Sequence, residues 1–133
     1  RDGGPEPPVG ISVPQAMYDD FVKICEPVRT IRADYPFEVK VREPRKRPIH
    51  IGGTDASAFA IKGVPTLGFT TEDIKGYNFS YGEIWHTERD LYTKNIPEYQ
   101  EHTATVTAIV TLGVANLDKL LPRDGLYLEE SNN

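Results

Sequence analysis

The segment His50–His86 limits the possible folds most strongly, because it alternates turn signals with short apolar runs. Gly52-Gly53 marks a turn. Ala56–Lys62 is long enough for two turns of helix, and Gly63 follows at the position where helices commonly end. Val64–Phe69 then predicts a buried strand. A short helix between two apolar segments is typical of an α/β layer structure.

Helical periodicity predicts one long helix on each side of this segment. Ser12–Gln15 has the spacing of a capping box, so we expect the first helix to begin there and Pro27 to kink or end it. Asn95–Glu98 repeats the capping pattern, and the last helix is predicted to span about Pro97–Leu121. The first apolar stripe contains Phe21, Ile24, Cys25 and Val28, and the second contains Val106, Ile109, Val110, Val114, Leu117 and Leu121.

The remaining predicted elements are few. Phe37–Val41 alternates apolar and polar residues, as a half-buried strand does, and Ile49–Ile51 is a further short apolar segment. Arg1–Gly10 is rich in Pro and Gly and predicts an exposed linker, and Leu126–Asn133 predicts a polar tail. We expect one α/β domain, a partial three-layer αβα sandwich whose small central sheet has three or four strands, with three helices. A sheet this small leaves edges uncovered, which indicates a partial domain or one completed by another chain.

Composition argues against several classes of function. The net charge of -5 disfavours a nucleic-acid or anionic-membrane partner, and no apolar run reaches the ~20 residues of a membrane span. Lys40–Arg47 carries five basic residues, for which a charged strand edge leading into a solvated turn is a better explanation than an anion patch. Cys25 is the one cysteine, so no intrachain disulfide forms, and we expect a buried structural thiol.

Three histidines are candidates for chemistry. His102 lies early in the last predicted helix, beside Glu101, which indicates a surface residue. His50 lies between two isoleucines at a predicted strand, where a core or edge histidine is the ordinary structural role. His86 differs, because it follows a long loop and has Trp85 before it. Acidic residues surround it in the sequence: Glu83, Glu88 and Asp90.

His86 has the surroundings of a metal ligand. A neutral imidazole is the commonest protein ligand for metals, and a carboxylate such as Asp90, four residues later, would fix its tautomer if the segment turns. The alternative is a solvated histidine beside acids. One histidine with scattered acids is not a complete zinc site, which needs at least three protein ligands. Spacing alone leaves both interpretations open.

Two further features are typical of a binding cleft. Thr54 and Asp55 follow the Gly-Gly turn at a predicted helix N-terminus, where exposed amides can bind an anion or a substrate carboxylate. An ordinary strand–turn–helix corner explains the same residues. Thr70–Glu83 is a long loop, and loops of this length are often functional. Its aromatic residues are Tyr77, Phe79 and Tyr81.

The order of these motifs resembles the C-terminal part of the co-catalytic zinc aminopeptidases, a family that also includes glutamate carboxypeptidases. The residues that carry the resemblance are GGTDASAFAIKGVPTLGF, the aromatic loop and WHTERDLYTKN. They are similar to the family's Gly-Ser-Asp turn, its Gly-Ile/Val-Pro strand and its His-Thr-x-x-Asp segment ahead of a final long helix. The match covers roughly Gly10 to Leu121.

The resemblance implies roles for particular residues. His86 corresponds to the last zinc ligand of the family, and Asp90 to the acid that follows it. Gly53–Asp55 match the turn beside the substrate cleft, and Tyr81 belongs to the aromatic loop of the pocket wall. Many members have a His where this chain has Ala56, which removes whatever substrate contact that His makes.

The family's upstream pattern has no counterpart here. A His-x-Asp, a Glu-Glu pair and a further Asp supply the other ligands and the general base in the family, and none is recognisable in this chain. The chain opens on Arg1 without a Met, so we expect the C-terminal portion of such an enzyme. For the complete enzyme the resemblance implies two zinc ions and a peptide substrate, hydrolysed near its N-terminus. The portion alone is expected to be inactive and to bind zinc weakly at best.

Other interpretations stay open. A glutaminyl-cyclase-like enzyme with one zinc has the same fold, and the upstream ligands would separate the two. A non-catalytic interaction domain would keep the fold without the metal, although the presence of His86 and Asp90 argues against it. The family favours a periplasmic or secreted location. We expect neither a nucleic-acid nor a membrane partner, and an exposed sheet edge or the final helix would permit a homo-oligomer.

Overall fold

The computed structural model describes residues 4–78 and 80–128. In this part of the chain the fold is mixed α/β, with a three-stranded sheet and four α-helices. The strands are β1 (Pro8–Val13), β2 (Glu38–Val41) and β3 (Phe69–Thr71), and the α-helices are α1 (Tyr18–Ile31), α2 (Ala56–Ala60), α3 (Tyr81–Ile84) and α4 (Pro97–Ala115). Short 3-10 helices span Gln15–Met17 and Tyr92–Lys94. The predicted small α/β sheet is confirmed, with one helix more than expected.

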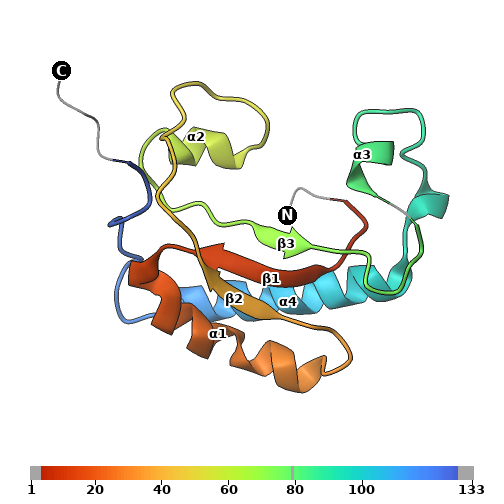
Figure 1. Ribbon diagram of the computed structural model, residues 1–133, viewed down its shortest axis with the longest axis horizontal. Coiled ribbons are helices and arrows are strands. Elements are labelled where there is room, and N and C mark those ends of the chain that lie inside the picture. Colours follow the sequence, from red (N-terminus) through yellow and green to blue (C-terminus); the bar gives the residue numbers. More distant parts are fainter. Residues whose placement is uncertain (1–3, 79, 129–133) are drawn as a thin grey trace.

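β1 is the central strand of the order β2-β1-β3 (Figure 1). It pairs in parallel with β2, where Ile11 lies opposite Val39, and antiparallel with β3, where Ile11 lies opposite Phe69. Parallel neighbours need a long crossover connection, and α1 supplies it between β1 and β2. Ile11 and Val39 are both buried, so the apolar side chains of the two strands enter one core.

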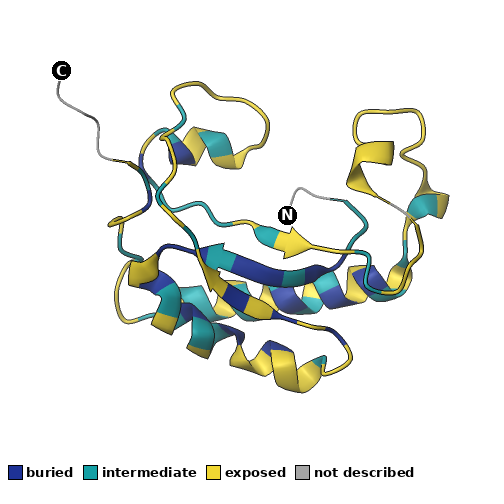
Figure 2. Cartoon of the chain, viewed as in Figure 1, coloured by how far each residue is buried: buried dark blue, intermediate teal, exposed yellow. Residues whose placement is uncertain are grey.

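The core lies between the sheet and two helices. α1 and α4 lie side by side, α1 against β2 and α4 against β1. Figure 2 shows the buried residues concentrated on β1 and along these two helices. The predicted stripe of α1 is buried at Phe21, Cys25 and Val28, and the helix continues past Pro27. The expectation of a buried thiol is confirmed, since Cys25 is 1% exposed and burial raises its pKa to about 11.

α2 and α3 add little to this core. Both lie beyond β3 in Figure 1, towards opposite ends of the molecule. α2 buries only Ala60, and α3 buries no residue. At the other edge of the sheet, β2 exposes Glu38 and Lys40, which form an ion pair at 3.1 Å. The described residues therefore form a sheet with one packed helical layer, where the sequence predicted layers on both faces. No helix among them is long and apolar enough to cross a membrane.

β1 lies where the sequence predicted a linker followed by a helix start. The strand begins at Pro8, so Arg1–Gly10 is not an exposed linker in its described part, and Ser12 is a strand residue rather than a helix cap. The residues before Gly4 lie outside the described chain. The prediction is wrong because Pro8 takes the first strand position, which proline tolerates. Gly10 then allows close pairing, since a Cβ there would lie 2.5 Å from the Glu38 carbonyl oxygen.

Two predicted apolar strands are also wrong. β3 contains only the last residue of Val64–Phe69, and the residues before it are irregular. Ile49–Ile51 is irregular and exposed, so His50 is neither a core nor a sheet-edge histidine. Flanking prolines and glycines explain both results, because Pro65 cannot donate to a ladder and Gly52-Gly53 interrupts any extension.

The last helix is shorter than predicted. α4 begins at Pro97, as expected, but ends at Ala115 rather than Leu121. Asn116 follows as the C-cap, a residue type that competes with helical hydrogen bonding. The predicted capping box is absent, because the N-cap is Ile96 and no side chain caps the helix.

The C-terminal segment is part of the core rather than a frayed tail. Leu126 is 1% exposed and belongs to the main hydrophobic cluster. Tyr127 forms a parallel bridge with Arg45, and the Leu128 N–H donates to the Arg45 carbonyl oxygen at 3.0 Å. The rest of the predicted tail, residues 129–133, lies outside the described chain.

Candidate functional site

His86 lies in an exposed turn directly after α3. Its backbone φ is 56°, in the left-handed region, and its imidazole contacts the Trp85 indole, with ring centroids 4.6 Å apart. Tyr81, at the start of α3, stacks on the same indole with centroids 5.9 Å apart. Across residues 4–78 and 80–128, no hydrogen bond or ion pair engages the imidazole of His86. Both ring nitrogens are therefore available to a ligand.

The predicted pairing of His86 with Asp90 is not formed. The segment does turn, and the Thr87 hydroxyl donates to the carbonyl oxygens of Glu83 and Ile84, both at 3.0 Å. The Asp90 N–H then donates to the Thr87 carbonyl oxygen at 3.2 Å. Within the part of the chain that the structure describes, no bond joins the exposed Asp90 carboxylate to the imidazole of His86.

Thr54 and Asp55 lie in the turn before α2. Ser57 closes this turn, since its hydroxyl donates to the Thr54 carbonyl oxygen at 2.8 Å and accepts from the Gly52 N–H at 2.9 Å. The N-cap of α2 is Asp55 rather than Thr54, and its side chain makes no capping bond. α2 and α3 lie towards opposite ends of the molecule in Figure 1, so the structure does not bring Thr54 and Asp55 to His86.

The described residues form no complete metal site. No group of three or more His, Cys, Asp or Glu side chains within residues 4–78 and 80–128 is placed to hold a metal ion. A zinc site needs at least three protein ligands. Within these residues His86 therefore lacks the partner ligands that a zinc ion needs.

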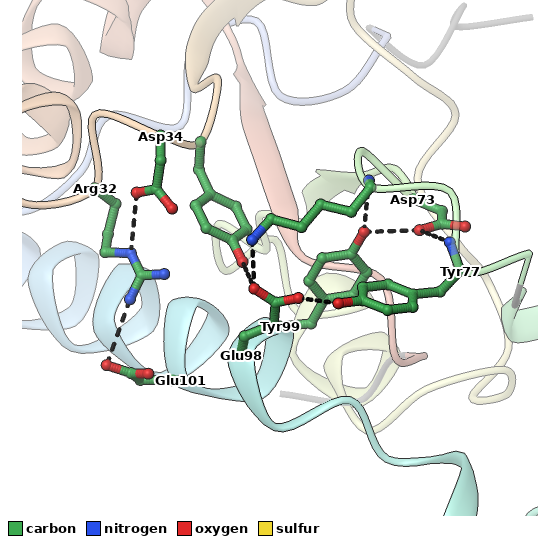
Figure 3. A network of polar contacts seen from close by, with 9 residues as sticks. Arg32, Asp34, Asp73, Tyr77, Glu98, Tyr99 and Glu101 are labelled. Atoms are coloured by element: carbon green, nitrogen blue, oxygen red, sulfur yellow. Dashed lines mark hydrogen bonds and ion pairs between the residues drawn. The ribbon is translucent and has the colours of Figure 1, made fainter.

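Sequence reasoning missed a polar network that fixes the aromatic loop to the start of α4 (Figure 3). The buried Tyr99 hydroxyl donates to Asp73 Oδ1 at 2.7 Å and accepts from the Lys75 N–H at 2.8 Å. Asp73 also accepts from the N–H groups of Tyr77, at 3.1 Å, and Asn78, at 2.7 Å. Burial, with the Asp73 bond adding to it, raises the pKa of Tyr99 to about 12. Phe79 lies outside the described residues.

Glu98 is the second anchor of this loop. Its carboxylate pairs with the Lys75 ammonium and accepts a hydrogen bond from the Tyr77 hydroxyl. The Tyr35 hydroxyl also donates to it, at 3.5 Å. The Lys75 bond, and after it the Tyr77 bond, lowers the pKa of Glu98, so the carboxylate stays ionised. The same contacts raise the pKa values of Lys75 and Tyr77.

His102 is fully buried, so the prediction of a surface residue is wrong. Its Nε2 donates to the Pro8 carbonyl oxygen at 2.9 Å, and its ring stacks on Tyr35, with centroids 4.0 Å apart. Nδ1 is buried and has no hydrogen-bond partner among the described residues. Burial lowers the pKa of His102, against the opposing effect of the Pro8 bond. Helical position alone did not reveal that β1 and the Tyr35 turn cover this residue.

Glu6 also contacts the candidate site, at Tyr81, and no sequence pattern predicted this contact. Its Oε1 accepts a hydrogen bond from the Tyr81 N–H at 2.8 Å, while Oε2 is buried without a hydrogen-bond partner in the described chain. A Cβ on Gly4 would lie 2.6 Å from Glu6 Oε2 and 2.7 Å from the Tyr81 Cβ. The segment before β1 therefore packs closely on α3.

Comparisons with known proteins found no relative: no protein-family model, no curated protein and no solved structure matches this chain. The possible roles of single residues rest on the order of the sequence motifs and on the geometry above.

Proposed function

We propose that this chain is the C-terminal portion of a zinc-dependent exopeptidase similar to the co-catalytic zinc aminopeptidases. The observation that carries the proposal is the order of three motifs ahead of a long helix: the Gly53–Asp55 turn, Gly63–Phe69 and His86–Asp90. His86 lies in an exposed turn, and its imidazole makes no hydrogen bond or ion pair with the described residues, which supports its assignment as a zinc ligand.

α4 supports the view that more protein packs against this portion. Residues 102–117 contain no charged side chain, and a helix that is apolar all round is normally buried. One side of α4 packs on α1 and β1, but the other is open, and Leu112 is 64% exposed. The open side is formed by Gln100, Thr103, Ala104, Thr107, Ala108, Thr111, Leu112 and Ala115. Further protein that covers this side would complete the domain.

In this proposal the chain supplies one ligand and part of the pocket wall. His86 would hold zinc through an imidazole nitrogen, and the Asp90 carboxylate would orient the ring if it moved to the imidazole. Tyr81 and Trp85 form an aromatic wall beside the ion. Bound zinc would polarise the scissile carbonyl and activate a water molecule. Thr54 and Asp55 would border the substrate cleft at its far end.

The function of His86 is tested by titrating the 133-residue chain with zinc while following the histidine ring signals by NMR. We expect weak binding that shifts the His86 signals and leaves those of His50 and His102 unchanged. The amide signals of the neighbouring Trp85 and Thr87 should shift with them, and His86→Ala should abolish these amide shifts. His50→Ala is the matched control, because His50 is also an exposed loop histidine, and it should change nothing.

Two results would contradict the proposal. A tight stoichiometric zinc site on the monomer would mean that the chain builds a complete site of its own. Zinc-dependent shifts of the Trp85 and Thr87 amides that persist undiminished in His86→Ala would show that His86 is not a ligand. The second result would favour a non-catalytic interaction domain with the same fold.

A further inference from the structure

Three arginines gather at the end of the molecule away from α3, and we call Arg45, Arg47 and Arg123 the arginine cluster. Arg45 and Arg47 belong to the connection between β2 and α2, and Arg123 follows α4. In Figure 1 the C-terminal segment and the chain around α2 lie at one end of the molecule, while α3 lies at the other. The cluster shares no residue with the proposed zinc site.

The guanidiniums of Arg45 and Arg47 have defined positions. Arg45 Nη2 donates to the Thr66 hydroxyl at 3.0 Å and to the Thr66 carbonyl oxygen at 3.2 Å. The Arg47 guanidinium lies over the Tyr127 ring, 5.6 Å from its centroid. The backbone bridge between Arg45 and Tyr127 holds these two segments in register. The side chains are thus oriented before any ligand arrives.

Two of the guanidiniums converge over Gly63. The Arg47 guanidinium occupies the space that a Cβ on Gly63 would fill, and Arg123 Nη1 lies 3.8 Å from the same position. Gly63 has φ +70°, a conformation that favours glycine, so the backbone beneath the two groups carries no side chain. The absence of a Cβ lets the Arg47 guanidinium lie against the backbone, and it brings the N–H donors of Arg47 and Arg123 to the same place.

Among residues 4–78 and 80–128, no ion pair neutralises the positive charges of the cluster. The ion pairs of the described chain use Arg32, Lys40, Lys75 and Lys119. None joins a carboxylate to an arginine of the cluster, although the whole chain has 20 acidic residues against 15 basic ones. Lys40, at the start of the same basic run, pairs with Glu38, whereas Arg45 and Arg47 turn towards the segment after α2. Neighbouring like charges repel, and a bound anion relieves that repulsion.

We propose that the arginine cluster binds a phosphate group between Arg47 and Arg123, with Arg45 fixed at its flank. Planar guanidiniums bind phosphate oxygens through paired N–H donors. Arginines on a solvated strand edge would not need to be held in fixed positions. The ligand is either free phosphate or a phosphate monoester on a larger molecule, since both present the same oxygens.

The test is a titration of the isotope-labelled chain with inorganic phosphate at constant ionic strength. We expect saturable shifts of the Gly63 amide and of the side-chain Nε–H signals of Arg47 and Arg123. The double variant Arg47→Gln/Arg123→Gln should bind at least tenfold more weakly, and each single variant should lie between. Arg89→Gln, which removes an exposed arginine outside the cluster, should bind like the wild type.

A parallel titration with phosphoserine distinguishes the two sources. Tighter binding of phosphoserine than of inorganic phosphate places the ligand on a larger molecule, and the reverse order indicates free phosphate. Shifts that fail to saturate, that sodium chloride reproduces, or that survive in the double variant would overturn the proposal. Because all three arginines are exposed, the variants should keep the wild-type spread of amide signals.

Discussion

The imidazole of His102 stacks on the ring of Tyr35, with centroids 4.0 Å apart and planes 14° from parallel. This contact joins α4 to the turn before β2, and the hydrogen bond from His102 Nε2 to Pro8 joins α4 to β1. The Arg32 guanidinium lies over the other ring of the stack, 4.8 Å from the Tyr35 centroid. A second proton on His102 would therefore place a buried charge near a cation.

The first prediction is a loss of stability in mild acid. Because burial lowers the pKa of His102, the unfolded chain binds more protons than the folded chain. The contribution of His102 to the free energy of unfolding is then fully present above about pH 6.5 and is lost as the pH falls below that value. Urea unfolding as a function of pH should show this decrease in the wild type and in the control His50→Gln. It should be smaller in His102→Gln, and an equal decrease there would show that another group is responsible.

The second prediction concerns the anchor of the aromatic loop. Tyr99→Phe removes the hydroxyl that bonds Asp73 and Lys75, so Asp73 loses one of its donors and the Lys75 N–H loses this acceptor. We expect the free energy of unfolding to fall by about 1–2 kcal/mol. Tyr92→Phe is the control, because Tyr92 is 91% exposed. Indistinguishable denaturant midpoints for the two variants would rule out the hydroxyl as an anchor.

The third prediction concerns the pairing of β1 with β2. Gly10→Ala places a Cβ 2.5 Å from the Glu38 carbonyl oxygen, so the strands must separate, at a cost of about 1–3 kcal/mol. Gly52→Ala adds the same methyl group where no heavy atom lies within 4 Å, and it should change stability little. Thermal melts of the two variants check this, and equal melting temperatures would argue against the close approach.

The fourth prediction is self-association of the isolated chain through the open side of α4. Uncharged apolar surface favours contact with a second copy when no other protein covers it. Sedimentation at several concentrations should show a mass that rises with concentration, and Leu112→Lys should reduce the rise. Leu120→Lys is the control, since Leu120 is 95% exposed and lies beyond α4. A strictly monomeric chain with a high, concentration-independent melting temperature would mean that these residues form a complete domain.

Local sequence patterns correctly predicted the elements whose secondary structure depends mainly on their own residues. The stripe of α1, the alternation of Phe37–Val41 and the position of α2 before Gly63 are all found, within a few residues, in the structure. In each case the apolar spacing fits one secondary structure only. The start of α4 at Pro97 follows the same logic, because proline favours the first helical turn.

Features that depend on distant segments could not be predicted. β1 is a strand because β2 and β3 flank it, and its own sequence, PVGISV, contains a proline and a glycine that disfavour strands. His102 is buried by Pro8 and Tyr35, and Tyr99 bonds to Asp73, all remote in the sequence. The exposed turn of His86 fits both interpretations that the sequence left open, and its separation from Thr54 and Asp55 follows from the placement of α2 and α3.

The proposed function implies a longer polypeptide, and zinc-dependent hydrolysis of an aminoacyl chromogenic amide by that polypeptide tests the central claim most directly. The account predicts hydrolysis that a chelator abolishes and that His86→Ala lowers by at least ~100-fold, because a ligand matters no less than the groups that orient it. His50→Ala should retain wild-type activity, and the 133-residue chain alone should show none above buffer. Wild-type activity in His86→Ala, or chelator-sensitive turnover by the 133-residue chain alone, would contradict it.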